Sequence, residues 1–275
     1  MGFTGFAIRL QQQYAAARQQ LQRFVAAPAG ASVIARSLSH EQARDLVVHY
    51  WVNQVIQMER WPECDGSGNV TWPKPTDKVK LKLNIAGVKF TPNNPQASGW
   101  TETRGLDLRN VVLVVRFTQY LKDNWGASVI YWGGLGIGGG RTDAADTHTE
   151  GLAMDFHGAV TAAGHFDVLR DWGNQRVAAA IGGDKSGRWP GAATKTSYRL
   201  AVDPLDLTKF LLSAAGPAGF FQDIYEYLTT QARHDSPETK PRIGEGSGIL
   251  HPDTPWNWLR PGHQNHFHFE VAKVK

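Results

Sequence analysis

The 275 residues of the chain include a single cysteine, Cys64. Cysteine is the residue whose disulfides cross-link many small secreted proteins. One cysteine excludes an intramolecular disulfide and any zinc site built from several thiolates. The chain also lacks a run of about eighteen apolar residues, the length needed to cross a bilayer, so we expect no membrane span. Residues 6–25 place apolar side chains at helical spacing, but the glutamines and arginines between them predict an amphipathic helix rather than a secretory signal.

The chain also has only a small excess of charge of one sign. The 29 Lys and Arg residues nearly balance the 25 Asp and Glu residues, which gives a formal net charge of +4. This excess favours approach to an anionic wall or membrane surface. It is too small, and the basic residues are too scattered, to predict a nucleic-acid-binding protein. With 41% hydrophobic residues, the chain is long enough to bury a full core.

Two motifs contain four of the ten histidines. The first is His148-Thr-Glu-Gly-Leu-Ala-Met-Asp155, and the second is His263-Gln-Asn-His266-Phe-His268. Two imidazoles and one carboxylate are a common way to hold a catalytic zinc ion while leaving its fourth position open. His148, Asp155 and His268 can supply that set. The other histidines of the second motif would then be acid or base groups.

The local sequence predicts how each motif folds. Residues 151–156 are mostly apolar and suit a buried strand that is entered from a loop carrying His148, and Gly151 permits the turn. His266 and His268 alternate with phenylalanines, which is the period of a strand with one polar and one apolar face. Both histidines should therefore face the same cleft. The glycine-rich segment 133–140 lacks the lysine of a phosphate-binding loop, so we predict a flexible rim of that cleft.

The order and spacing of these residues resemble a known family. The pattern His-x-x-Gly-x-Ala-x-Asp followed by His-x-His is similar to the metallopeptidases grouped as lysostaphin, D-Ala-D-Ala carboxypeptidase and sonic hedgehog relatives. The extra histidine, His263, is most similar to the D-Ala-D-Ala carboxypeptidase and murein endopeptidase branch. The match covers residues 128–157 and 262–272. It implies an α+β fold in which a small antiparallel sheet with flanking helices surrounds a zinc cleft.

The resemblance also implies roles for individual residues. It makes His148, Asp155 and His268 the ligands of one Zn²⁺ ion, His266 the catalytic histidine, and His263 an assisting residue.

The chain departs from the family pattern at two places. Family members usually have a serine two residues before the first ligand, where this chain has Asp146, which can orient His148 or cap a turn. They also carry a Ser-Gly-Tyr-Arg element whose arginine binds substrate. Here the corresponding strand, residues 128–132, is followed by the glycines and then by Arg141. We expect Arg141 to hold a substrate carboxylate from a different backbone position.

The implied substrates are the stem peptides of peptidoglycan, cut either by a carboxypeptidase or by an endopeptidase reaction. We expect a protein made in the cytoplasm that acts on the cell wall or periplasm, after phage lysis or delivery by an injection machine. Two alternatives stay open. One is a non-catalytic zinc-binding structural or binding protein with the same fold, and the other is a peptidase of non-wall peptides.

The predicted organisation has two parts. Residues 1–100 form an N-terminal helical extension or subdomain, and residues 101–275 form the zinc peptidase domain with a long insertion at about 160–260. Helices are predicted at 39–60, 107–123, 206–214 and 220–232, and strands at 79–85 and 128–132. The remaining histidines are interpreted as structural: His40, His49, His157, His165, His234 and His251.

Overall fold

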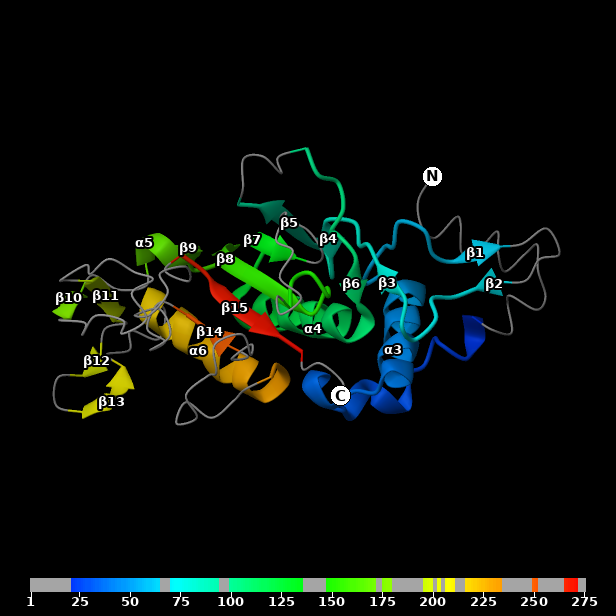
Figure 1. Cartoon of the computed structure of the whole chain (residues 1–275), viewed down its shortest axis with the longest axis horizontal. Helices are drawn as coiled ribbons and strands as arrows, with labels where there is room; N and C mark the ends of the chain where they lie inside the picture. Colours follow the sequence, from blue (N-terminus) through cyan, green and yellow to red (C-terminus); the bar gives the residue numbers. More distant parts are fainter. Residues whose placement is uncertain are drawn as a thin grey trace, which may run out of the picture.

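The chain forms an α+β fold, as the sequence predicted (Figure 1). The computed structural model describes residues 21–64, 70–93, 99–135, 147–171, 175–179, 195–199, 202–203, 206–210, 216–233, 249–251 and 265–271. The helices are η1 (Ala29–Ser32), η2 (Ala35–Ser37), α3 (His40–Val52), α4 (Leu108–Trp125), α5 (Val168–Asp171) and α6 (Pro217–Gln231). The strands are β1 (Glu63–Cys64), β2 (Val70–Thr71), β3 (Lys78–Val79), β4 (Asn84–Ile85), β5 (Val88–Pro92), β6 (Leu106–Asp107), β7 (Val129–Leu135), β8 (Ala153–Thr161), β9 (Gly164–Asp167), β10 (Gln175–Ala179), β11 (Lys195–Arg199), β12 (Val202–Asp203), β13 (Asp206–Phe210), β14 (Ile249–Leu250) and β15 (Phe267–Glu270).

A seven-stranded sheet forms the centre of the molecule (Figure 1). Its order is β14-β15-β8-β7-β5-β4, with β9 also paired to β8. The strands pair antiparallel except for β5 and β7, which run parallel, so the predicted antiparallel sheet is a mixed one. The two strands that carry the motifs, β8 and β15, are direct neighbours, and Asp155 lies opposite His268 in their register. The pairing of two distant segments therefore brings the two motifs together.

The helix α4 packs against one face of this sheet and sets its apolar side. It begins after the N-cap Asp107, whose side chain accepts from the backbone N–H of Arg109, and ends at Gly126 in the left-handed region. Phe117 of α4 lies with its ring centroid 5.3 Å from that of Phe156 on β8 and 5.0 Å from that of Phe269 on β15. Because side chains alternate along a strand, the neighbours of the two strand phenylalanines, Asp155 and His268, project from the opposite face of the sheet.

The N-terminal part of the chain is joined to the central sheet. The strands β4 and β5 belong to that sheet, and β5 pairs with β7. The domain boundary predicted at residue 100 therefore lies between two strands that are paired with each other. The helix α3 begins at the capping box of Ser39 and Gln42, as predicted, but ends at Val52. Arg116 of α4 donates to the carbonyls of Val33 and Ala31, which ties the segment before α3 to the core.

Apart from α3 and the two motif strands, which form β8 and β15, three further predicted elements agree with the structure and two do not. The helices at 107–123 and 220–232 correspond to α4 and α6, and the strand at 128–132 to β7. The predicted helix at 206–214 is wrong over residues 206–210, which form β13, because the helix-like spacing of Leu207 and Phe210 is overridden by antiparallel pairing with β12. The predicted strand at 79–85 is divided between β3, two isolated bridges and β4. The predicted helix at 6–25 lies almost wholly outside the described residues.

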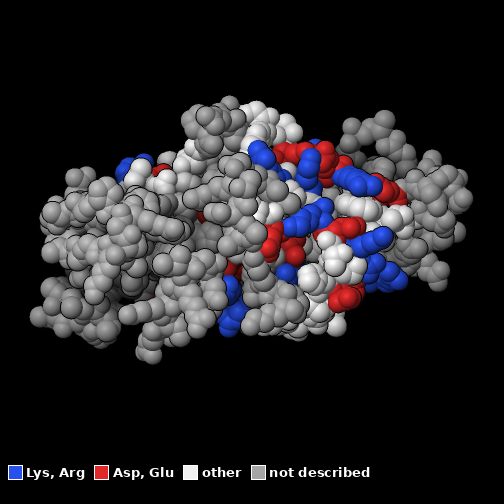
Figure 2. All heavy atoms as spheres, in the orientation of Figure 1, with Lys and Arg blue, Asp and Glu red and all other residues white. Residues whose placement is uncertain are grey.

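Charged side chains of both signs are interspersed on the surface that is shown in Figure 2. Nζ of Lys80 lies 3.1 Å from carboxylate oxygens of both Glu59 and Glu102, and Nζ of Lys82 lies 3.1 Å from a carboxylate oxygen of Glu102.

No helix in the described part of the chain is both long enough and apolar enough to cross a membrane.

Candidate metal centre

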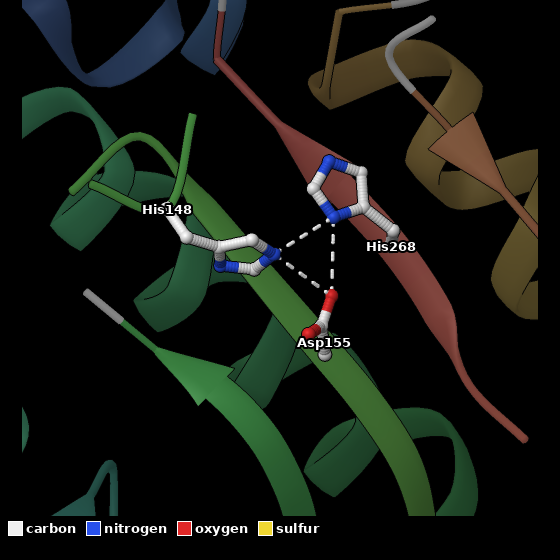
Figure 3. A group of neighbouring side chains, drawn as sticks. All are labelled: His148, Asp155 and His268. Carbon is white, nitrogen blue, oxygen red and sulfur yellow. Dashed lines mark hydrogen bonds and ion pairs between the residues drawn. The ribbon is translucent and has the colours of Figure 1, made fainter. Parts of the chain in front are cut away.

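Three side chains from three separate segments converge on one point (Figure 3). His148 lies in a turn before β8, Asp155 on β8 and His268 on β15. The distance from Nε2 of His148 to Nδ1 of His268 is 3.0 Å, and both nitrogens lie 3.1 Å from Oδ1 of Asp155. These are the three residues that the sequence predicted as metal ligands, and the structure brings them together.

This arrangement fits a divalent metal ion. Two ligands at about 2.0–2.1 Å from one tetrahedral zinc ion lie roughly 3.3 Å apart, and the three observed separations are close to that value. Two imidazole nitrogens and one carboxylate oxygen are also a donor set that such ions accept. The group can therefore hold a metal ion, and among the described residues it is the one cluster of this kind.

Two glycines allow the segments to approach this closely. Gly151 has φ +72°, and a Cβ atom there would lie 2.5 Å from the carbonyl oxygen of Gly105. On β7, a Cβ atom at Gly134 would lie 2.6 Å from Oδ2 of Asp155 and 2.8 Å from Cε1 of His148. The start of the glycine-rich segment is thus packed against the centre rather than being a flexible rim. Residues 136–140 lie outside the described part.

The charges within the centre support one another. Burial alone would raise the pKa of the Asp155 carboxyl, but the neighbouring imidazoles of His148 and His266 hold it well below its usual range. Burial would likewise lower the pKa of His268, but hydrogen bonds to Asp155 and Glu270 raise it to about 10. Without a metal ion, His268 is therefore a cation at neutral pH. Metal binding must release its proton.

His266 lies beside the three ligands, at the position that the sequence predicted for a catalytic group. Its Nε2 lies 3.5 Å from Oδ1 of Asp155, and its Nδ1 lies 2.8 Å from Oδ1 of Asn265. The amide oxygen can only accept, so Nδ1 carries the proton and Nε2 faces the centre with its lone pair. Burial lowers the pKa of His266 to about 4, which keeps the imidazole neutral at pH 7. Its unprotonated Nε2 can therefore accept a hydrogen bond from a polar group at the centre.

His157, which the sequence analysis interpreted as structural, also lies on this face. It follows Asp155 by two residues on β8, and its ring centroid is 5.2 Å from that of His266. The side-chain amide of Asn93 contacts its Nδ1 at 2.9 Å. Burial lowers the pKa of His157, so it is a second neutral imidazole beside the centre. Its separation from Asp155 by two residues within one strand was the signal that could have indicated this position.

Glu270 is a further residue that the sequence analysis missed. It is fully buried on β15, and its Oε2 lies 3.2 Å from Nε2 of His268. The alternation that linked His266 to His268 continues for one more step to Glu270, so the same period would have found it.

Three other predicted residues, His263, Arg141 and Asp146, lie outside the described part of the chain. Their assignments stay predictions.

Comparisons with known proteins add no family to these findings. No family model, no curated protein and no solved structure matches the chain. The centre is therefore characterised by its own residues and geometry.

Proposed function

We propose that the chain is a zinc-dependent peptidase that hydrolyses stem-peptide or cross-link bonds of peptidoglycan. The observation that carries the proposal is the position of His266, a neutral buried imidazole 3.5 Å from the same Asp155 oxygen on which His148 and His268 converge. A ligand set with a proton acceptor beside it is the minimum that zinc-assisted hydrolysis requires.

The residues of the chain divide the chemistry between them. His148, Asp155 and His268 would hold the zinc ion, which supplies Lewis acidity and an activated nucleophile at neutral pH when it is bound. His266 accepts a proton at Nε2 or donates it back to the developing charge on the substrate. Of the predicted residues outside the described part, His263 would protonate the leaving amine and Arg141 would hold a substrate carboxylate.

Two features favour catalysis over a purely structural metal. Structural zinc sites have four protein ligands and are closed, whereas the described residues of this centre supply three. In addition, His266 is turned toward the centre by its hydrogen bond to Asn265, although it is not one of the three. The choice of peptidoglycan as substrate rests on the resemblance of the two motifs. A non-catalytic zinc-binding protein is the second candidate, because three ligands suffice to hold the ion.

The test is mass spectrometry of the products that the zinc-loaded protein releases from purified sacculi of several cross-link types. The controls are a chelated sample, His266→Ala, and His165→Ala, which removes an exposed histidine of β9. We expect new muropeptides with the wild type and His165→Ala only, while His266→Ala still binds zinc. An absence of products from every wall type at stoichiometric zinc would contradict the proposal and favour the second candidate.

A further inference from the structure

Glu270 is a buried carboxylate with three different partners. The first is His268, whose Nε2 lies 3.2 Å from Oε2 of Glu270. The second is Arg233, just after α6, whose Nη1 lies 3.2 Å from Oε1. The third is the side chain of Thr147, which also forms a hydrogen bond to this carboxylate. Glu270 of β15 thus contacts a ligand on its own strand, the segment after α6 and the turn before β8.

The contact with His268 determines which nitrogen of that ring faces the centre. A carboxylate can only accept, so Nε2 of His268 donates its proton to Glu270. The other nitrogen, Nδ1, is the one that lies 3.0 Å from His148 and 3.1 Å from Asp155. An imidazole that donates one N–H to a carboxylate is held in one tautomer and orientation, and its other nitrogen becomes a better metal ligand.

The contact with Thr147 extends the same control to the second imidazole. Thr147 is buried and directly precedes His148 in the chain. Its carbonyl accepts from the backbone N–H of Leu152 at 2.9 Å, which closes the turn that carries His148. One carboxylate therefore contacts the segments that bear both histidines of the centre.

Arg233 makes it possible to keep this carboxylate ionised in the protein interior. An unpaired buried charge is strongly destabilising, and Arg233 offsets it from the end of α6. The backbone N–H of Arg233 also donates to the carbonyl of Glu270 at 2.8 Å, which fixes the two residues relative to each other. A helix from the long insertion between the two motifs thus contributes to the geometry of the centre.

We propose that Glu270 is a positioning residue that acts through His268 and Thr147 to hold both imidazoles in the geometry that binds the metal ion. Arg233 supports it by balancing its charge. The proposal rests on the zinc binding that belongs to the proposed function, but it does not require hydrolysis.

The test measures zinc affinity in Glu270→Ala and Glu270→Gln by competition with a chromophoric chelator, together with the visible spectrum of the Co²⁺-substituted proteins. Loss of the carboxylate should weaken zinc binding about 10–100-fold in Glu270→Ala, and it should shift the Co²⁺ bands. Glu270→Gln should fall between the alanine variant and the wild type, because its amide oxygen still accepts from Nε2 of His268 but carries no charge.

Phe269→Leu is the matched control, since it changes the adjacent residue on the apolar face of the same strand. It should lower the unfolding midpoint and leave the zinc affinity and the Co²⁺ spectrum of the folded protein unchanged. If neither Glu270 variant folds, Arg233→Gln decides, and it should weaken zinc binding by a smaller factor. Wild-type affinity and spectrum in a folded Glu270→Ala protein, or in Arg233→Gln where that variant decides, would overturn the proposal.

The outcome is independent of the peptidase assay. If the wild type cleaves no sacculi but the affinity falls as expected, the proposed function fails and the positioning role stands. If the wild type cleaves sacculi and the affinity is unchanged in Glu270→Ala, only the positioning role fails.

Discussion

The two faces of the β8–β15 ribbon are built from alternate residues of the same strands, yet they are stabilised in different ways. On one face, Phe156 and Phe269 pack against Phe117 of α4, and their contacts require only apolar partners of suitable shape. On the other face, Asp155 and His268 are held by hydrogen bonds and charges. The apolar face can tolerate substitution by similar volumes, whereas each group on the polar face depends on particular partners.

The largest expected effect is on the polar face. Asp155→Asn removes the charge that both imidazoles share, and we expect zinc affinity to fall at least about 100-fold and hydrolysis to be lost. Metal content after dialysis, measured by atomic emission, checks this. Asp123→Asn, an exposed change near the end of α4, is the control and should keep its metal. A stoichiometric zinc content in Asp155→Asn would remove this residue from the ligand set.

The corresponding change on the apolar face should separate stability from metal binding. Phe269→Ala deletes a fully buried ring, and we expect it to reduce the free energy of unfolding by about 3–5 kcal/mol. Urea denaturation of the metal-free protein measures the loss. The zinc affinity of the folded protein should stay near that of the wild type. A large loss of affinity would show that the two faces are coupled through the strand.

A third change tests how closely β7 approaches the centre. Gly134→Ala places a Cβ atom within contact distance of Asp155 and His148, so these side chains must shift. We expect zinc binding to weaken roughly tenfold in chelator competition. Gly99→Ala is the control because a Cβ atom there meets nothing within 4 Å. Equal affinities in the two variants would show that the ligands adjust freely to the new methyl group.

The last expected effect is the pH dependence of the metal-free protein, which changes stability without removing a side chain. The pKa of His268 rises from 6.5 to about 10 on folding, so its protonated form stabilises the fold fully below about pH 6.5. This contribution is lost as the pH rises toward 10. Thermal unfolding with chelator present should therefore show declining stability over this range, and His268→Gln should show a weaker decline. Parallel profiles for the two proteins would argue against the raised pKa.

The same contrast explains what could be predicted from the sequence. Apolar periodicity identified α4, α6 and the strand before the first motif, because burial of apolar groups requires no specific partner. Motif spacing identified the three ligands. Strand alternation places Glu270 and His157 on the same face as the ligands, but the sequence does not reveal their partners Arg233 and Asn93, which are distant along the chain. The spacing of Leu207 and Phe210 predicted a helix, and only the pairing of residues 206–210 with β12 shows that this segment is a strand.

Asp155 and His268 are 113 positions apart in the chain, so metal binding at the centre also affects the stability of the fold. An ion that both residues bind closes a long loop between two paired strands. It reduces the entropy of the unfolded chain only if both residues keep the ion bound after unfolding. In the folded state it adds stability in proportion to the logarithm of its free concentration over its dissociation constant. In a chain with one cysteine, the metal ion would serve as the reversible cross-link that a disulfide provides elsewhere.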